Sequence, residues 1–314
     1  MSNDSFFAPK NSWYTNNAIG EACHMDAPAG GGGPGKFVFA GSLGINDYLH
    51  GLEINPLAPA ARFLTPQQIK QQANVARPDL VDVSKISGLM TSLGWPKSAA
   101  LMNRWLKNAA HTAPEYDTPE TKIVNMEWVL GFSRAKSVYD KLIKERIWQN
   151  NKARKQIKEM LAEKGLLQRK AGYTASFGDF NLAINKLDGE YINHRVSGMS
   201  NVFYDDMDGA LGNFAFRVLV KGSLKCQSGS AIEVSLTAIG VYIRDSYDFN
   251  GEQPLGPWNL SDDPSGFWGS MSPTWVTNSD FRKWRDAHEK GGDFLIFSDI
   301  KEITLPAPEV FLIP

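Results

Sequence analysis

Apolar residues follow one spacing before residue 170 and another after it. Over residues 61–170 they recur at helical intervals, which is typical of amphipathic helices. Over residues 171–314 they alternate with polar residues, and glycine, aromatic and β-branched residues become more frequent, as is typical of strands. The two spacings predict an α+β fold, with a helical domain at 61–170 followed by a mostly antiparallel, half-barrel-like β domain at 171–314.

Helix start signals subdivide the helical region. Thr65-Pro66 and Trp95-Pro96 each place proline at a first helical position, where its missing N–H costs nothing. The longest helical pattern runs from Thr118 to Lys164, and Asn150-Asn151 is a candidate break within it. Gly165 is suited to the C-terminal cap, since glycine adopts the left-handed conformation readily. We therefore expect at least three helices before residue 170.

Two alternating runs predict the main strands of the β domain. The first runs from Phe214 to Val220, and the second includes Val234, Leu236, Ala238 and Tyr242, which we expect on one buried face. Lys221-Gly222 and Gln227–Ser230 supply turn residues between the two strands.

A short helix and a strand close the predicted domain. The pattern places the helix at Phe281–Glu289, capped by Asn278 or Ser279. Gly291-Gly292 ends it, and Asp293–Phe297 is predicted as the final strand.

Residues 1–60 lack regular spacing. The run from Ala27 to Lys36 contains four consecutive glycines, and we interpret it as a linker because glycine disfavours helix and strand interiors. A phosphate-binding loop requires serine or threonine after its lysine, whereas this chain has Phe37. We therefore predict an irregular N-terminal segment.

Composition limits the classes of partner. The formal net charge is −1, which provides no global field for nucleic acid, and we predict no nucleic-acid partner. The N-terminus lacks the regions of a signal peptide, and no apolar run reaches the roughly 18 residues of a transmembrane segment. Cys23 and Cys226 are expected to be unpaired, as in a protein made in the bacterial cytoplasm.

The densest polar cluster follows the second alternating run, from Arg244 to Asn250. In an extended strand Asp245 and Tyr247 project to one face, and a bend after Tyr247 would bring Asp248 towards Asp245. Two carboxylates and a phenol can bind a hard divalent cation such as Mg²⁺ or Ca²⁺ and can orient water for attack on phosphorus. The alternative is that these residues cap a turn, as Asp and Asn often do at strand ends.

The segment GVYIRDSYDFN resembles the motif of colicin M and related bacteriocins, which carry Asp-x-Tyr-Asp on their catalytic domain. The segments LGNFAFRVLVKGSL and GGDFLIFSDIKEI are similar to flanking strands of that family, so the resemblance covers about residues 203–305. It implies cleavage of lipid II, the lipid-linked peptidoglycan precursor, with a divalent cation. Matched in order are Gly240, Asp245, Tyr247, Asp248, Phe249 and Asn250.

The resemblance also implies roles for these residues. Asp245 would be the acid/base or metal-associated carboxylate, Asp248 would support it, and Tyr247 would position phosphate oxygens or pack the loop. The family places a His-Arg pair a few residues after the asparagine, where this chain has GEQPLGPW. Candidate substitutes are His194-Arg195, Arg244 and His288, each of which also suits a structural or surface role.

The whole chain also resembles an uncharacterised proteobacterial family associated with type VI secretion. The segments that carry this resemblance are RDSYDFNGEQPLGPWN and FRKWRDAHEKGGDFLIFSD. It implies a protein that is made without a signal peptide and delivered to the periplasm of a target bacterium. It also implies an immunity protein and a secretion spike protein as partners.

Three hypotheses remain open at the level of sequence. The first is an antibacterial lipid II hydrolase. The second is a non-enzymatic binding or secretion-loading module that keeps a colicin M-like fold, with the aromatic loop from Trp258 to Trp275 as its surface. The third is membrane perturbation by residues 118–164, because the stretch from Lys141 to Lys170 contains ten Lys/Arg and only three Glu. Basic helices of this kind can bind a membrane surface, and the alternative is that the charges lie on a solvated helical face.

Overall fold

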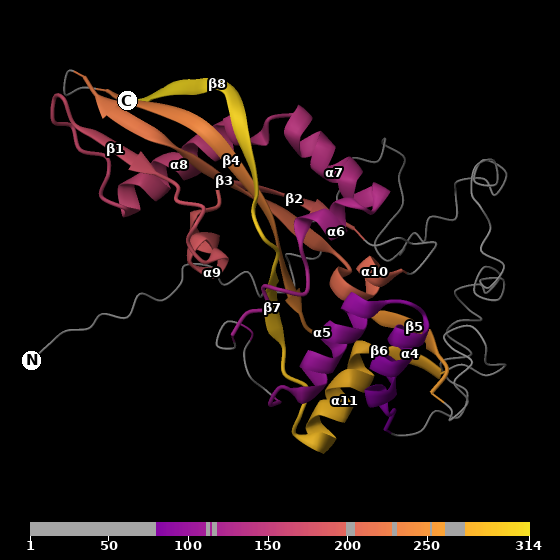
Figure 1. Ribbon diagram of the computed structural model, residues 1–314. Coiled ribbons are helices and arrows are strands. Elements are labelled where there is room, and N and C mark those ends of the chain that lie inside the picture. Colours follow the sequence, from indigo (N-terminus) through magenta and orange to yellow (C-terminus); the bar gives the residue numbers. More distant parts are fainter. Residues whose placement is uncertain are drawn as a thin grey trace, which may run out of the picture. The chain divides into compact units, whose positions relative to one another are not determined.

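The computed structural model describes residues 80–110, 114, 118–198, 205–227, 231–251, 253–260 and 274–314. Several predictions lie outside these residues: the irregular segment 1–60, the helix start at Thr65-Pro66, Cys23, and most of the aromatic loop. Within them the protein is an α+β fold with a mostly antiparallel sheet (Figure 1).

Helices and strands follow one another as the two spacings predict. The helical elements are η2 (Val83–Lys85), α4 (Ile86–Ser92), α5 (Pro96–Lys107), α6 (Met126–Leu130), α7 (Ser133–Lys144), η4 (Ile147–Gln149), α8 (Asn151–Glu163), α9 (Ile184–Leu187), η5 (Asp188–Glu190), α10 (Asp206–Leu211) and α11 (Asn278–His288). The strands are β1 (Thr174–Phe177), β2 (Asn193–Ser197), β3 (Phe214–Cys226), β4 (Ile232–Tyr247), β5 (Pro254–Trp258), β6 (Thr274–Thr277), β7 (Phe294–Phe297) and β8 (Lys301–Ile313).

The break predicted at Asn150-Asn151 is confirmed, because α8 begins at Asn151 with Asn150 as its N-cap. The start predicted at Thr118 is wrong, because the first helix of this segment is α6, which begins at Met126, and α7 follows it as a separate helix. Asparagine side chains start two of these helices: Asn125 accepts a hydrogen bond from the N–H of Trp128, and Asn150 accepts one from the N–H of Ala153. Each N-cap satisfies a backbone donor that a continuous helix would have paired internally. The start of α5 at Pro96 and the left-handed Gly165 after α8 are confirmed.

The two longest strands, β3 and β4, form the centre of a six-stranded sheet. They pair antiparallel from Ala215 opposite Arg244 to Cys226 opposite Ile232. Strands β1 and β2 pair with the other side of β3, and β7 and β8 pair with the other side of β4. A separate two-stranded sheet joins β5 and β6.

A bulge in the central hairpin overturns two predictions. Gly222 lies inside β3, and a Cβ built there would lie 2.1 Å from the carbonyl oxygen of Ser235, so the close pairing requires glycine. Opposite it, the ladder skips Thr237. An extra residue reverses which side chains face which side. Leu236 therefore lies in the main core, whereas Tyr242 lies on the other face of the sheet.

The two faces of the sheet carry different apolar clusters. One face packs against the helices, with Phe216 and Ile243 from the strands and Trp105 and Leu142 from the helices in the same buried core. The opposite face carries a smaller cluster, whose fully buried members are Leu187, Leu219, Tyr242 and Phe297. Alternation along β3 and β4 assigns successive side chains to these two environments.

The end of the chain departs from the prediction in two ways. The strand at Phe294–Phe297 is not the last, because β8 follows and pairs with β4; its prolines at 306 and 308 disguise the strand pattern. Helix α11 begins at Asn278 and is capped by Thr277, whose side chain forms a reciprocal capping box with Asp280.

None of the helices in the described part of the chain is long and apolar enough to cross a membrane. Cys226 is buried as a free thiol.

Candidate functional site

The motif predicted from the sequence occupies the end of β4. Arg244 pairs with Phe297 of β7, and Tyr247 pairs with Phe294. Tyr247 packs into the main core on the face that also holds Ile243, so Asp245 projects to this face as well, and Arg244 projects to the other. The strand ends at Tyr247, as the predicted bend requires.

Asp245 is a partly buried carboxyl group, and within the described ranges it forms no ion pair. Burial raises its pKa well above the ordinary value, and the nearby Asp248 carboxylate raises it further. The backbone N–H of Ser246 and the charge of Arg244 act in the opposite direction. Among the described residues, that N–H is the hydrogen-bond donor to Asp245. A carboxyl group that is desolvated and accepts few hydrogen bonds is a candidate acid/base residue.

Asp248 begins the loop after β4 and is partly engaged there. Its Oδ1 accepts hydrogen bonds from the backbone N–H of Asn250 at 3.3 Å and from the Asn250 side chain at 2.9 Å. This is the turn-capping geometry that the alternative interpretation expected. Asp248 is nevertheless close enough to Asp245 and to Asp293 to raise the pKa of both, so three carboxyl groups lie near the end of the strand.

Asp293, which sequence analysis did not single out, lies just before β7. It accepts a hydrogen bond from Trp105 Nε1 at 2.8 Å, and Arg285 of α11 contacts both of its oxygens at 3.2 and 3.3 Å. Arg285 and Trp105 thus hold Asp293 in place. Within the described ranges, no group of three acidic, histidine or cysteine residues has the arrangement of a metal site, and the predicted cation stays a prediction.

Aromatic side chains hold the loop after β4, which carries Asp248 and which we call the motif loop, against the core. Tyr247 stacks on Phe294 with ring centroids 5.3 Å apart, and Phe249 stacks on Phe281 of α11 at 3.7 Å. Burial raises the pKa of the Tyr247 hydroxyl. Of the two roles predicted for Tyr247, these contacts support packing of the loop.

Helix α11 also fixes the backbone of the motif loop. Arg282 donates to the carbonyl oxygens of Phe249 and Gly251 at 2.7 and 2.6 Å. The side chain of Asn278 donates to the carbonyl oxygen of Asn250. The loop that carries Asp248 is therefore held at several points, and its geometry is set by a helix that comes later in the chain.

The candidate substitutes for the His-Arg pair are not gathered around Asp245. His288 is exposed and stacks on Trp284, and its Nδ1 lies 2.8 Å from the Trp284 carbonyl oxygen. Arg195 forms an ion pair with Glu145. Arg244 faces away from Asp245, and its Nε lies 3.4 Å from Asp188 Oδ2.

His194 is the remaining candidate. It belongs to the face of the sheet that carries the smaller apolar cluster around Tyr242, which we call the second face. It pairs with Arg217 in the β2–β3 ladder and contacts the ring of Tyr191 at 6.1 Å. Burial lowers its pKa, and the charges of Lys152 and Arg217 lower it further. His194 thus favours the neutral form.

A polar cluster on this second face was missed from the sequence, apart from His194 and Arg244. Asp188 Oδ1 accepts hydrogen bonds from Arg217 Nη1 at 2.6 Å and from the Tyr242 hydroxyl at 2.7 Å. The Arg217 guanidinium lies 4.0 Å from the centre of the Tyr191 ring. We call the following residues the Asp188 cluster: Asp188, Tyr191, His194, Arg217, Tyr242 and Arg244.

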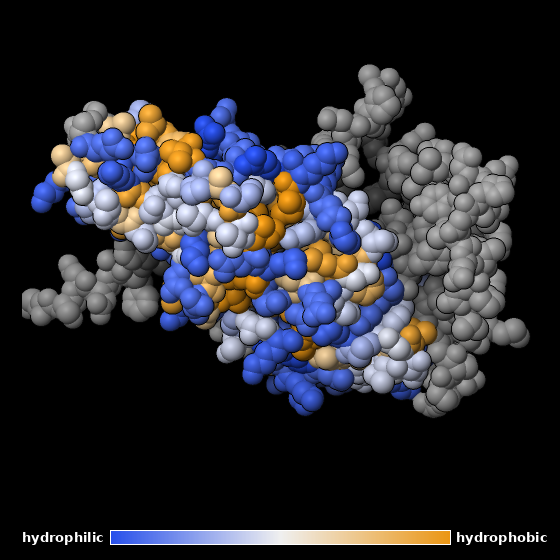
Figure 2. Space-filling model, turned by 45° about the horizontal axis from the view of Figure 1, so that its top comes forward, coloured by the Kyte–Doolittle hydropathy of each residue, from blue (hydrophilic) through white to orange (hydrophobic). Residues whose placement is uncertain are grey.

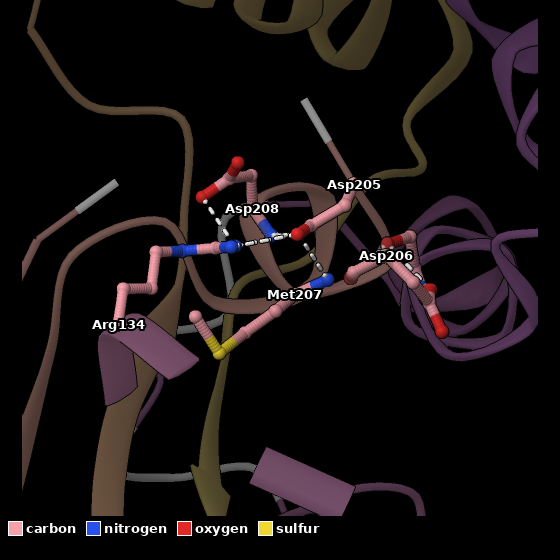
Figure 3. Close-up of polar contacts among 6 residues, drawn as sticks. Arg134, Asp205, Asp206, Met207 and Asp208 are labelled. Carbon is pink, nitrogen blue, oxygen red and sulfur yellow. Dashed lines mark hydrogen bonds and ion pairs between the residues drawn. The ribbon is translucent and has the colours of Figure 1, made fainter. Parts of the chain in front are cut away.

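A second missed network anchors α10, the helix before β3. Arg134 of α7 makes a two-point contact with Asp205 at 2.6 and 2.5 Å and reaches Asp208 at 2.9 Å (Figure 3). Asp206 turns the other way and accepts hydrogen bonds from the Ser98 backbone and hydroxyl. The successive acidic residues thus tie α10 to two different helices, which is a structural role.

Comparison with known proteins identifies a family for the chain. A family model described as a family of unknown function, DUF6402, matches residues 81–262 and 269–313. Since these ranges make up more than half of the chain, the protein belongs to this family. Neither the curated proteins nor the solved structures include a significant match.

Proposed function

We propose that this DUF6402 protein is an antibacterial toxin that hydrolyses a polyprenyl pyrophosphate-linked peptidoglycan precursor. The observation that carries the proposal is the state of Asp245: a partly buried carboxyl group, near Asp248, with a pKa well above the ordinary value. Lipid II is the substrate that the resemblance of the surrounding motif to colicin M implies.

The chemistry assigns different roles to the two carboxyl groups. A carboxyl group with a raised pKa retains its proton to higher pH than an ordinary carboxyl group and can donate it. Water would form a bond to phosphorus while the bond from phosphorus to the prenyl oxygen breaks. Asp245 would protonate that oxygen, and Asp248 would accept a proton from the water. A divalent cation, Mg²⁺ or Ca²⁺, would neutralise the pyrophosphate oxygens.

The test is cleavage of labelled lipid II by the purified chain with Mg²⁺ or Ca²⁺. We expect release of a pyrophosphorylated muropeptide, and we expect Asp245→Asn to lower the rate by about 100-fold or more, as loss of a general acid does. The matched control is Asp140→Asn, which removes an exposed carboxylate paired with Lys136 on α7. Undiminished cleavage by Asp245→Asn would exclude the proposed role.

Delivery and partners form a second part of the proposal. The protein would be made in the cytoplasm and would act in the periplasm of a target bacterium, where a dedicated immunity protein would protect kin. Directing the chain to the periplasm of a sensitive cell should cause lysis, and Asp245→Ala should not. A secretion spike protein would be the delivery partner.

A second candidate function is a non-enzymatic binding or secretion-loading module. The positions of His194 and His288 favour it, because His194 belongs to the opposite face of the sheet, whereas His288 is exposed and stacks on Trp284 of α11. Stable co-purification with a spike protein, together with no cleavage of lipid II at any divalent cation, would favour this candidate. Rapid cleavage would exclude it.

A further inference from the structure

The Asp188 cluster lies on the face of β4 opposite to Asp245, and the proposed hydrolysis does not use it. Arg217 and Arg244 share the carboxylate of Asp188. The cluster therefore combines two permanent positive charges with one negative charge. A surplus of positive charge on one face attracts anions to it.

Arg217 is arranged to bind an oxyanion in addition to Asp188. A guanidinium group has five N–H donors in a rigid fork, and the polar partners of Arg217 among the described residues are Asp188 and Tyr242. The side chain is 14% exposed, and Tyr191 supports one side of its plane. The remaining donors are therefore oriented before a ligand arrives, which suits phosphate oxygens.

Apolar side chains border these cations. Phe180, Ile184 and Tyr191 are partly buried and pack on the small cluster around Tyr242. Leu182, between them in sequence, is 47% exposed. The Lys221 ammonium, which pairs with Glu302 at 3.3 Å, lies 5.8 Å from the Phe180 ring.

Gly240 allows Phe180 to pack closely on the sheet. A Cβ built at Gly240 would lie 2.7 Å from Ile300 Cγ2 and 3.2 Å from the Phe180 ring. Glycine at this position thus lets Phe180 approach the backbone of β4. Figure 2 shows hydrophobic residues gathered in small patches among hydrophilic ones on the face in view.

We propose that the Asp188 cluster and the segment 180–184 bind the phosphate group and the adjoining hydrocarbon of an anionic lipid. Charge complementarity favours phosphate at Arg217 and Arg244. Leu182 is exposed and lies in sequence between Phe180 and Ile184, which pack on the cluster around Tyr242, and it favours a ligand with an alkyl chain. Cationic side chains bordered by apolar ones are typical of protein surfaces that bind at a lipid interface. The site is independent of hydrolysis, since Asp245 lies on the other face of β4.

The experiment is flotation of the full chain with vesicles of phosphatidylcholine alone and with added phosphatidic acid. We expect binding to the phosphatidic acid vesicles and a loss of about fivefold in affinity for Arg217→Gln, which is typical of one arginine at an anionic surface. Leu182→Ser should weaken binding without touching the ion pairs, so it decides the result if Arg217→Gln fails to fold. Leu312→Ser is the matched control, because Leu312 is 63% exposed on β8, away from the cluster.

Three results would overturn the proposal. Equal binding to neutral and anionic vesicles would remove the role of phosphate. Equal losses for Leu182→Ser and Leu312→Ser would place binding elsewhere. Binding of inorganic phosphate without vesicle binding would assign the site to a free anion. Asp245→Asn should leave vesicle binding unchanged, so failure of hydrolysis and failure of lipid binding can be told apart.

Discussion

Two aspartates on opposite faces of the same sheet have opposite environments. Asp188 is held by Arg217, Tyr242 and Arg244, whereas Asp245 is partly buried beside another carboxylate and has a raised pKa. The first arrangement stabilises the fold. The second costs stability, and groups of this kind concentrate at functional sites. Asp188 therefore contributes to stability, whereas Asp245 is kept at a cost to stability.

The largest effect on stability should come from Asp188→Ala. The substitution leaves two arginines and the Tyr242 hydroxyl without their shared acceptor. Side chains of Asp188 and Arg217 are 19% and 14% exposed, so solvent compensates little, and we expect a loss of about 3 kcal/mol in unfolding free energy. Urea denaturation measures it. A loss below about 0.5 kcal/mol, as at exposed ion pairs, would show that the three contacts do not act together.

The sequence predicts the Asp245 side of this comparison better than the Asp188 side. Asp245, Tyr247 and Asp248 are neighbours along the chain, so alternation in one strand is enough to predict their faces and the bend. The Asp188 cluster draws on η5, β2, β3 and β4. Its members meet through a register that depends on the bulge at Thr237, and no local pattern reveals that reversal.

The same limit explains where the predicted fold was wrong. Helix and strand content follows from spacing, which is a local property. The break at Asn125 depends on a side chain that competes for backbone donors, and strand β8 depends on a partner distant in sequence. Arg282 and Asn278 fix the motif loop from α11, a contact that only the folded chain brings about.

The raised pKa of Asp245 should make the stability of the protein depend on pH. A carboxyl group with a raised pKa in the folded state binds its proton more tightly there than in the unfolded chain. Its unfavourable contribution is therefore absent below the ordinary pKa of 3.8 and grows as pH rises towards the folded value. Asp245→Asn removes this titration, so the variant should become more stable relative to the wild type as pH rises from 4 to 8.

Urea midpoints of the two proteins across that range measure the effect, which we expect to be smaller than the loss caused by Asp188→Ala. A stability difference that does not change with pH would contradict the raised pKa. A difference of the opposite sign, with the wild type gaining on Asp245→Asn as pH rises, would mean that Asp245 has a stabilising cationic partner.

The smallest effects should distinguish the two tyrosines on the two faces. Tyr242→Phe removes the hydrogen bond of 2.7 Å to Asp188, and a hydrogen bond to a charged group contributes about 1.5 kcal/mol. Tyr247→Phe keeps the ring stacked on Phe294 and removes a hydroxyl without a hydrogen bond among the described residues, so it should cost less than about 0.5 kcal/mol. Both variants conserve ring volume, so packing cannot account for a difference between them. Equal losses in urea denaturation would show that the Tyr247 hydroxyl has a partner as strong as Asp188, and the motif face would then be as tightly bonded as the other.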